Sequence, residues 1–358
     1  MQTDVLIVGG GLSGLSLARH LDTKNRDYRL FESRDRFGGR IVTETVNSKN
    51  DSGYFDLGPA WFWPGQPRMA RLVGELGLQV FEQYSKGALL FEDEQGQVFK
   101  DAGYASMAGS YRLKGGFSAL IDAMTEQLAN ERLYLKMHVT EIKQGNTQLL
   151  VSIKKHDDVI ETIQCNKVVL ALPPRVAADN IKYSPGLDQQ VITSMRGIPT
   201  WMAGQAKIMA VYETPFWRDS DLSGDVMSRR GPMVEIHDAS PVEGGPYALF
   251  GFVGYGVNAR KDREEVLRHS AQEQLVRLFG EHASQPIKLI LQDWAFEPET
   301  ATDLDAIPLG HHPAYGLPDA LSQIWDDRLI MGSTEIAESF GGYLEGACEA
   351  SESVLKQL

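Results

Sequence analysis

The chain has 358 residues, of which 42% are hydrophobic and 23% are charged, which suits a soluble globular protein long enough for two domains. Its 35 basic and 48 acidic side chains give a formal net charge of -13. Nucleic acids and anionic membranes demand clustered Lys and Arg, so this balance disfavours both as partners; it mildly suits a cationic substrate, or simply serves solubility.

The N-terminal region predicts one βαβ unit. Residues 4–8 form a short apolar run, typical of a strand buried in a parallel sheet. A glycine-rich turn leads into a helical pattern over 12–21, and the chain returns as a second strand over 28–31.

The turn reads GGGLSG and matches the G-x-G-x-x-G pattern of dinucleotide sites. In that pattern Gly9 makes the turn, Gly11 lets a pyrophosphate reach the backbone, and Gly14 lets the helix and the strand pack closely. Glu32 ends the second strand, where a carboxylate can accept hydrogen bonds from ribose hydroxyls. The turn therefore indicates dinucleotide binding, and the plainer alternative is an ordinary βα turn with a surface glutamate.

The later elements follow from hydrophobic spacing. Helices are predicted over 68–78, 117–128 and 263–279, and strands over 133–135, 148–153, 159–165, 168–172, 205–212, 247–253 and 329–331. Because no repeat, low-complexity tract or flexible linker separates these elements, the two domains are predicted to interleave.

A second glycine-led helix start lies near the C-terminus, in SFGGYLEGACEAS. Gly341 and Gly342 run into a helical pattern that begins at Leu344. Glycine is more common after helices than before them, so a pair in this position indicates a close backbone approach to a ligand, often an anion. A merely glycine-capped helix is the alternative.

The two cysteines, Cys165 and Cys348, cannot form a disulfide framework, so a reducing, cytoplasmic location is predicted. Neither a signal peptide nor a transmembrane run is recognisable. The adjacent pair His311 and His312 lacks a third ligand at useful spacing, so we expect loop residues and no metal site.

Several motifs together resemble the flavin-containing amine oxidase family, which includes the monoamine oxidases. They are ESRDRFGGR, FDLGPAW, the glycine pair at 115–116, HV at 138–139, VVLALPP, QAKIMAVYETPFW and GSTEIAESFGGYLEGACEAS. The resemblance implies an α/β fold: a Rossmann-like FAD-binding domain with an interleaved substrate domain built from a mixed sheet plus helices. We expect the FAD-binding domain over 1–80, 112–178 and 300–358, and the substrate domain over 81–111 and 179–299.

The resemblance also implies which residues bind FAD. The first helix start would hold the pyrophosphate, Val139 would offer its backbone to the adenine, and the helix start at Leu344 would face the pyrimidine end of the flavin ring. The full expected set is Gly9, Gly11, Leu12, Ser13, Gly14, Glu32, Ser33, Arg34, Gly38, Gly39, Arg40, Gly58, Pro59, Ala60, Trp61, Val139, Ser333, Thr334, Glu335, Gly342, Tyr343 and Leu344.

Lys207 and Tyr343 are the expected catalytic residues. In the family that the chain resembles, a lysine matching Lys207 holds a water at flavin N5 and assists the reaction with oxygen, although a lysine here can also snorkel from an edge strand. Tyr343 matches one wall of an aromatic cage around the substrate amine. A gap-free count from Trp294 places the second wall at Leu304, so the cage looks half built.

Three other aromatic residues are candidates for the second wall: Trp61, Trp63 and Trp201. Asp303 stands where some family members carry a flavin-linked cysteine, so FAD is expected to be non-covalent. The short loop between Leu90 and Tyr111 suggests an abbreviated lid and an open site.

The expected reaction is oxidation of the C–N bond of an amine or amino acid. Hydride would pass to flavin N5, and O2 would reoxidise the flavin to give H2O2. Two alternatives stay open: a desaturase-like or renalase-like oxidase of C–C bonds or dihydronicotinamides, and a flavin-containing accessory protein that docks a partner.

Overall fold

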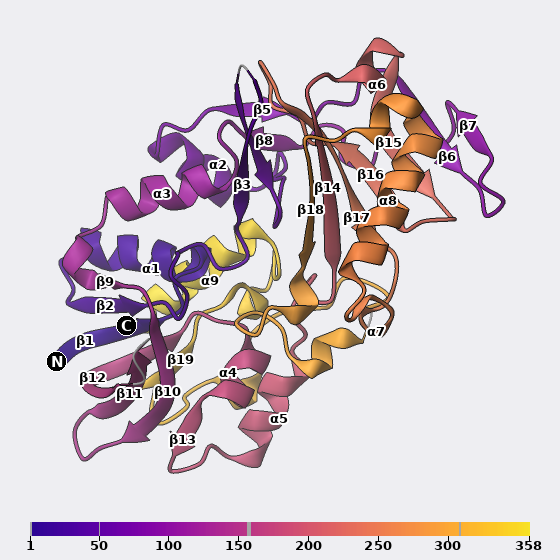
Figure 1. Ribbon diagram of the computed structural model, residues 1–358. Coiled ribbons are helices and arrows are strands. Elements are labelled where there is room, and N and C mark those ends of the chain that lie inside the picture. Colours follow the sequence, from indigo (N-terminus) through magenta and orange to yellow (C-terminus); the bar gives the residue numbers. More distant parts are fainter. Residues whose placement is uncertain (1, 50, 156–158, 308) are drawn as a thin grey trace.

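The computed structural model describes residues 2–49, 51–155, 159–307 and 309–358 (Figure 1). Its α-helices are α1 (Leu12–Thr23), α2 (Pro67–Glu75), α3 (Ser118–Glu126), α4 (Pro174–Asn180), α5 (Gln189–Gly197), α6 (Phe216–Asp219), α7 (Val257–Arg260), α8 (Glu264–Phe279) and α9 (Leu344–Leu355). Its strands are β1 (Gln2–Val8), β2 (Tyr28–Phe31), β3 (Thr43–Asn47), β4 (Ser52–Asp56), β5 (Val80–Glu82), β6 (Ala88–Glu92), β7 (Val98–Lys100), β8 (Tyr111–Leu113), β9 (Leu133–Tyr134), β10 (Met137–Gln144), β11 (Leu149–Lys155), β12 (Ile160–Leu170), β13 (Lys182–Ser184), β14 (Ala206–Tyr212), β15 (Leu222–Ser228), β16 (Met233–Asp238), β17 (Tyr247–Val253), β18 (Lys288–Asp293) and β19 (Leu329–Met331).

The first sheet has the order β13-β10-β11-β12-β1-β2-β9, and β19 pairs with β12. Its centre is parallel, because β1 runs parallel to both β12 and β2. Val5 and Ile7 pack on one face of β1 and Leu6 and Val8 on the other, which explains the unbroken apolar run of this strand. Figure 1 shows α1, α3 and α9 together over one face of this sheet.

The second sheet has the order β18-β14-β17-β16-β15-β6-β7. Helix α8 covers one of its faces, where Leu267, Ala271 and Leu275 pack against alternate residues of β14 (Figure 1). The residues between them, such as Met209 and Val211, point to the opposite face and pack with Trp61. Strand β14 is therefore buried on both sides.

The predicted elements are present, and two of them form a single strand. The strands expected over 159–165 and 168–172 are one strand, β12, because it keeps the same register to β1 throughout: Thr3 pairs with Cys165 and Val5 pairs with Lys167. Strands β3–β8, β10, β13, β15, β16 and β18 and helices α4–α7 were not predicted. In β10, a half-exposed mixture of polar and apolar residues gives little periodicity. The division into an FAD-binding and a substrate domain stays a prediction. Across the described ranges, no helix has both the length and the apolar character needed to cross a membrane.

Helix α9 is anchored to the start of α2 by a buried carboxylate. Glu345 accepts hydrogen bonds from the backbone N–H groups of Arg68 and Met69, at 3.1 and 2.8 Å, and pairs with the Arg68 guanidinium at 3.2 Å. These amides belong to the first turn of α2 and have no acceptor inside that helix. Glu345 thus caps α2 from another helix.

We expect Glu345→Ala to destabilise the protein, because buried amides lose their acceptor and Arg68 loses one of its two carboxylate partners. An unsatisfied buried donor costs about 1–3 kcal/mol, so the free energy of unfolding should fall by roughly 3 kcal/mol in a urea titration. The control is Glu338→Ala, which removes an exposed carboxylate near the same helix and should change stability by less than about 0.5 kcal/mol. Equal stability of the two variants would contradict the capping role.

Candidate functional site

A cavity of about 680 Å³ is lined by residues from both sheets and their connections. Its volume lies within the range of pockets that enclose small-molecule ligands. Lys207, Tyr343 and the predicted cofactor-binding residues line it, with the exceptions of Gly14 and Glu335. The residues predicted from the sequence therefore lie together around a single cavity.

The glycine turn after β1 has the geometry that its pattern predicts. A β-carbon at Gly14 would lie 2.0 Å from the Gly9 carbonyl oxygen, so only glycine lets α1 pack this closely on the turn. At Gly11 a β-carbon would meet no protein atom nearer than 3.9 Å and would instead take up free space. Because Gly11 lines the cavity, its missing side chain leaves room for a ligand against the backbone.

Two carboxylates share one end of the cavity. Glu32 is buried and accepts hydrogen bonds from the backbone N–H groups of Gly10, at 2.8 Å, and Arg34, at 2.9 Å. The hydroxyl of Ser33 lies 3.2 Å from Glu32 and 2.7 Å from Glu299. Each carboxylate has acceptor sites beyond these, so this end suits a ligand that offers hydroxyl donors, such as a ribose.

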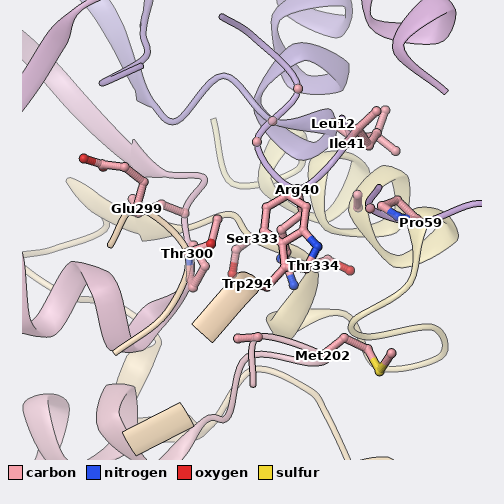
Figure 2. Close-up of a pocket in the computed structure, with 18 of the residues that line it drawn as sticks. Leu12, Arg40, Ile41, Pro59, Met202, Trp294, Glu299, Thr300, Ser333 and Thr334 are labelled. Carbon is pink, nitrogen blue, oxygen red and sulfur yellow. The ribbon is translucent and has the colours of Figure 1, made fainter. Parts of the chain in front are cut away.

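Arg40 and Ser333 form a second polar stretch of the wall (Figure 2). The Arg40 guanidinium lies 2.7 Å from the buried carboxylate of Glu335, an ion pair whose orientation does not make it a hydrogen bond. The Ser333 hydroxyl is buried and has no hydrogen-bond partner among the described residues. A cation and an orphaned hydroxyl facing a cavity fit an anionic group such as a pyrophosphate.

The start of α9 opens on the same cavity through Gly342, Tyr343 and Leu344. Gly342 has φ of +81°, a left-handed conformation that favours glycine, and it brings the chain round into the helix. The first amides of a helix lack intrahelical acceptors and carry partial positive charge. This end of the cavity can therefore stabilise negative charge on a bound ring.

Lys207 is enclosed in the cavity wall at only 5% exposure. Its ammonium donates a hydrogen bond to the Gly58 carbonyl and lies 4.6, 5.3 and 5.7 Å from the ring centres of Phe250, Phe252 and Trp61. Strand β14 lies between β17 and β18, so the alternative of a lysine snorkelling from an edge strand is wrong.

The burial of Lys207 changes its acidity. Loss of water lowers the pKa of the ammonium to about 7, while the Asp56 carboxylate opposes this shift and the Arg112 guanidinium adds to it. Near neutral pH the side chain can therefore hold or release a proton, which an exposed lysine cannot do.

Tyr343 belongs to a cluster of rings. His312 stacks on it with 4.9 Å between ring centres and 15° between planes, and Trp201 meets His312 edge-on at 4.6 Å. The His312 ring donates from Nε2 to the Gly341 carbonyl at 3.0 Å, which holds the stack in place. His312 does lie in a loop as predicted, but sequence reasoning missed its contact with Tyr343.

Counting without gaps from Trp294 to Leu304 does not locate a second aromatic wall of the cavity. Leu304 is 39% exposed and does not line the cavity. It sits in a 3₁₀ turn over Asp303–Ala306, which begins with a capping box between Thr302 and Asp305. The three tryptophans that the sequence offers for a second wall, Trp61, Trp63 and Trp201, all line the cavity.

Other lining residues were not predicted at all. Glu299 and Thr300 come from the loop after β18, close behind Trp294, whose indole donates to the Leu57 carbonyl at 3.1 Å (Figure 2). The second sheet and its loops add Met107, Val234, Glu235 and Phe252. Over the described ranges, no three His, Cys, Asp or Glu side chains gather where a metal ion could bind.

Comparison with known proteins places this chain in a family. The family model for flavin containing amine oxidoreductases matches residues 12–105 and 89–354. Among curated proteins, the chain is similar to the probable flavin-containing monoamine oxidase A of Dictyostelium discoideum, at 24% identity over 99% of this chain and 97% of the relative. It is also similar to the putative flavin-containing monoamine oxidase AofH of Mycobacterium tuberculosis, at 24% identity over 98% and 95%.

Solved structures share the fold. Wild-type putrescine oxidase bound to putrescine superposes with a TM-score of 0.81 at 20% identity, covering 99% of each chain. Cyclohexylamine oxidase from Brevibacterium oxydans superposes with a TM-score of 0.79 at 16% identity, covering 99% of this chain and 98% of that one. The chain therefore belongs to the flavin-containing amine oxidoreductase family and is an FAD-dependent oxidoreductase.

Proposed function

We propose that the protein is an oxidase of the C–N bond of an amine or amino acid that uses O2 and forms H2O2. When bound, FAD supplies the hydride acceptor and the two-electron chemistry. The observation that carries the proposal is Lys207, a lysine buried among aromatic rings in the wall of the cavity.

The polar groups of the cavity support a specific placement of FAD. Glu32 would accept hydrogen bonds from the ribose, and Arg40 with Ser333 would face the pyrophosphate. The flavin ring would then extend toward Lys207 and the start of α9, whose amides favour negative charge at the far edge of the ring. This assignment gives partners to Glu32, to Arg40 and to the orphaned hydroxyl of Ser333.

Lys207 would assist the oxygen half of the reaction. An ammonium shielded from water stabilises the negative charge that develops on oxygen more strongly than an exposed one does. The rings around Lys207 keep water out, and the carbonyl of Gly58 fixes the direction of its head group.

Tyr343 would orient the substrate amine. His312 supports one face of its ring, so the ring presents a fixed surface to the cavity, where Trp201 is also exposed. Aromatic faces hold cationic amines and guide a neutral amine toward the reaction centre. The similar solved structures are oxidases of putrescine and cyclohexylamine, both amines, which favours an amine here.

The alternative, an oxidase of C–C bonds or dihydronicotinamides, drew its support from a half-built aromatic cage. Trp61, Trp63 and Trp201 at the cavity weaken that support, because aromatic surface is present without Leu304. The accessory-protein alternative gives the enclosed Lys207 no purpose.

Glu32→Ala should weaken the retention of FAD. Charge-assisted hydrogen bonds contribute about 1.5–3 kcal/mol, so we expect FAD to dissociate with a Kd at least tenfold higher. Fluorescence of released FAD measures this, and Asp35→Ala, which removes an exposed carboxylate three positions away, is the matched control. Equal FAD affinity in both variants would sink the ribose assignment.

Lys207→Met should slow the oxygen half-reaction while FAD binding and anaerobic reduction by an amine stay largely intact. Met keeps the apolar stem and removes the charge, and loss of one electrostatic stabiliser costs about 2.7–4 kcal/mol, roughly a hundredfold or more in rate. Stopped-flow spectroscopy separates the two half-reactions, with Lys288→Met, an exposed lysine of the neighbouring strand β18, as control. Unchanged reoxidation would refute the role, and slower reduction alone would place Lys207 among the substrate contacts.

FAD should be released intact when the protein is denatured with acid. Both cysteines are buried away from the cavity, so no thiol is placed to form a bond to the flavin. Centrifugation after acid treatment should leave the yellow colour in the supernatant. Colour that stays with the precipitate would disprove the non-covalent mode.

A further inference from the structure

A carboxylate that the proposed chemistry does not use lies in the cavity wall. Glu235 of β16 stands opposite Phe252 of β17, and Phe252 stands opposite Lys207 of β14. Partners across neighbouring strands point to the same face, and all three residues line the cavity. Glu235 therefore lies two strand spacings, or about 10 Å, from Lys207 along the sheet.

Among the described residues, hydrogen bonds reach only one carboxylate oxygen of Glu235. The His237 ring contacts Oε1 from Nε2 at 2.9 Å, and the Ser106 hydroxyl donates to the same oxygen. In the described part of the chain, no hydrogen bond reaches Oε2. The hydrogen bond from His237, aided by that from Ser106, outweighs burial and holds the pKa of Glu235 below its usual value, so the carboxylate is ionised at neutral pH.

The surroundings of Glu235 leave negative charge unbalanced. His237 bonds Asp225 through its other ring nitrogen at 2.7 Å, so one imidazole serves two carboxylates. Even a protonated His237 leaves an excess of one negative charge in this group of three. Within the described ranges, no Lys or Arg forms an ion pair with Glu235, and its side chain is 25% exposed.

We propose that Glu235 binds a second ammonium group of the substrate, which makes the preferred substrate an aliphatic diamine or polyamine. The inference rests on the proposed amine oxidation: one amino group would lie at Tyr343 and Lys207, and the other would reach Oε2 of Glu235. The methylenes between them would cross Phe252, an apolar surface that suits an alkyl chain. A carboxylate that serves only to hold His237 would not discriminate between diamines and monoamines.

The test compares the binding of 1,6-diaminohexane and hexylamine to holoprotein reduced with dithionite, which cannot turn over. Isothermal titration calorimetry at pH 7.5 keeps both amines protonated. The parent protein should bind the diamine about tenfold to a hundredfold more tightly than the monoamine. Glu235→Gln should lose most of that preference while its affinity for hexylamine stays unchanged.

Two further variants make the result specific. Glu235→Asp keeps the charge and should retain a preference for diamines, whereas Glu243→Gln removes a charge from an exposed loop and should behave as the parent. The proposal is overturned if the parent shows no preference for the diamine, or if Glu235→Gln keeps it. If Glu235→Gln bound neither amine, the proposal would also be overturned, because Glu235 would then maintain the shape of the site and would not bind the second ammonium group.

Anaerobic mixing of the oxidised holoprotein with the same two amines tests the underlying reaction separately. If the diamine reduces the flavin faster than hexylamine in the parent but not in Glu235→Gln, the inference and the proposed function both stand. If neither amine reduces the flavin while the binding preference persists, amine oxidation is wrong and the ammonium site is still supported.

Discussion

The hydrogen bond from Lys207 to the Gly58 carbonyl is the contact on which the site depends. It joins an interior strand of the second sheet to the segment that follows β4, and so fixes how the two halves of the cavity meet. Burying an amine away from water is costly unless it is hydrogen-bonded, and the surrounding rings offer only partial compensation. The lowered pKa of Lys207 records this cost. Because Lys207 is the one charged side chain in an otherwise apolar strand, we propose that the chemistry is concentrated around it.

The cavity wall carries ionisable side chains of both kinds. Glu32, Glu299 and Glu235 are carboxylates, whereas Arg40 and Lys207 are basic, and Glu235 lies two strands away from Lys207 on the second sheet. In the proposed placement, Glu32 faces hydroxyl donors, Arg40 faces an anion, Lys207 faces an electron-rich ring and Glu235 faces a cation. The protein can thus distinguish the two ends of an elongated ligand by charge alone, with apolar surfaces between them.

Sequence reasoning succeeded where the signal is local. The turn between β1 and α1 needs its glycines for reasons that operate within a few residues, and the apolar runs of β1 and β14 reflect burial on both faces. It failed where position depends on long-range pairing. Glu235 reaches the cavity only because the register of three strands aligns it with Lys207, and His312 meets Tyr343 only through the path of a loop. Counting from Trp294 to Leu304 assumed a fixed loop length, and Leu304 does not line the cavity.

The two glycine-led helix starts lie far apart in sequence yet open on one cavity, and α1 packs directly on α9. The cavity is complete only when residues from both regions are folded together. Loss of the contact between α1 and α9 would remove part of its wall, so we expect a ligand that fills the cavity to stabilise the folded chain as a whole.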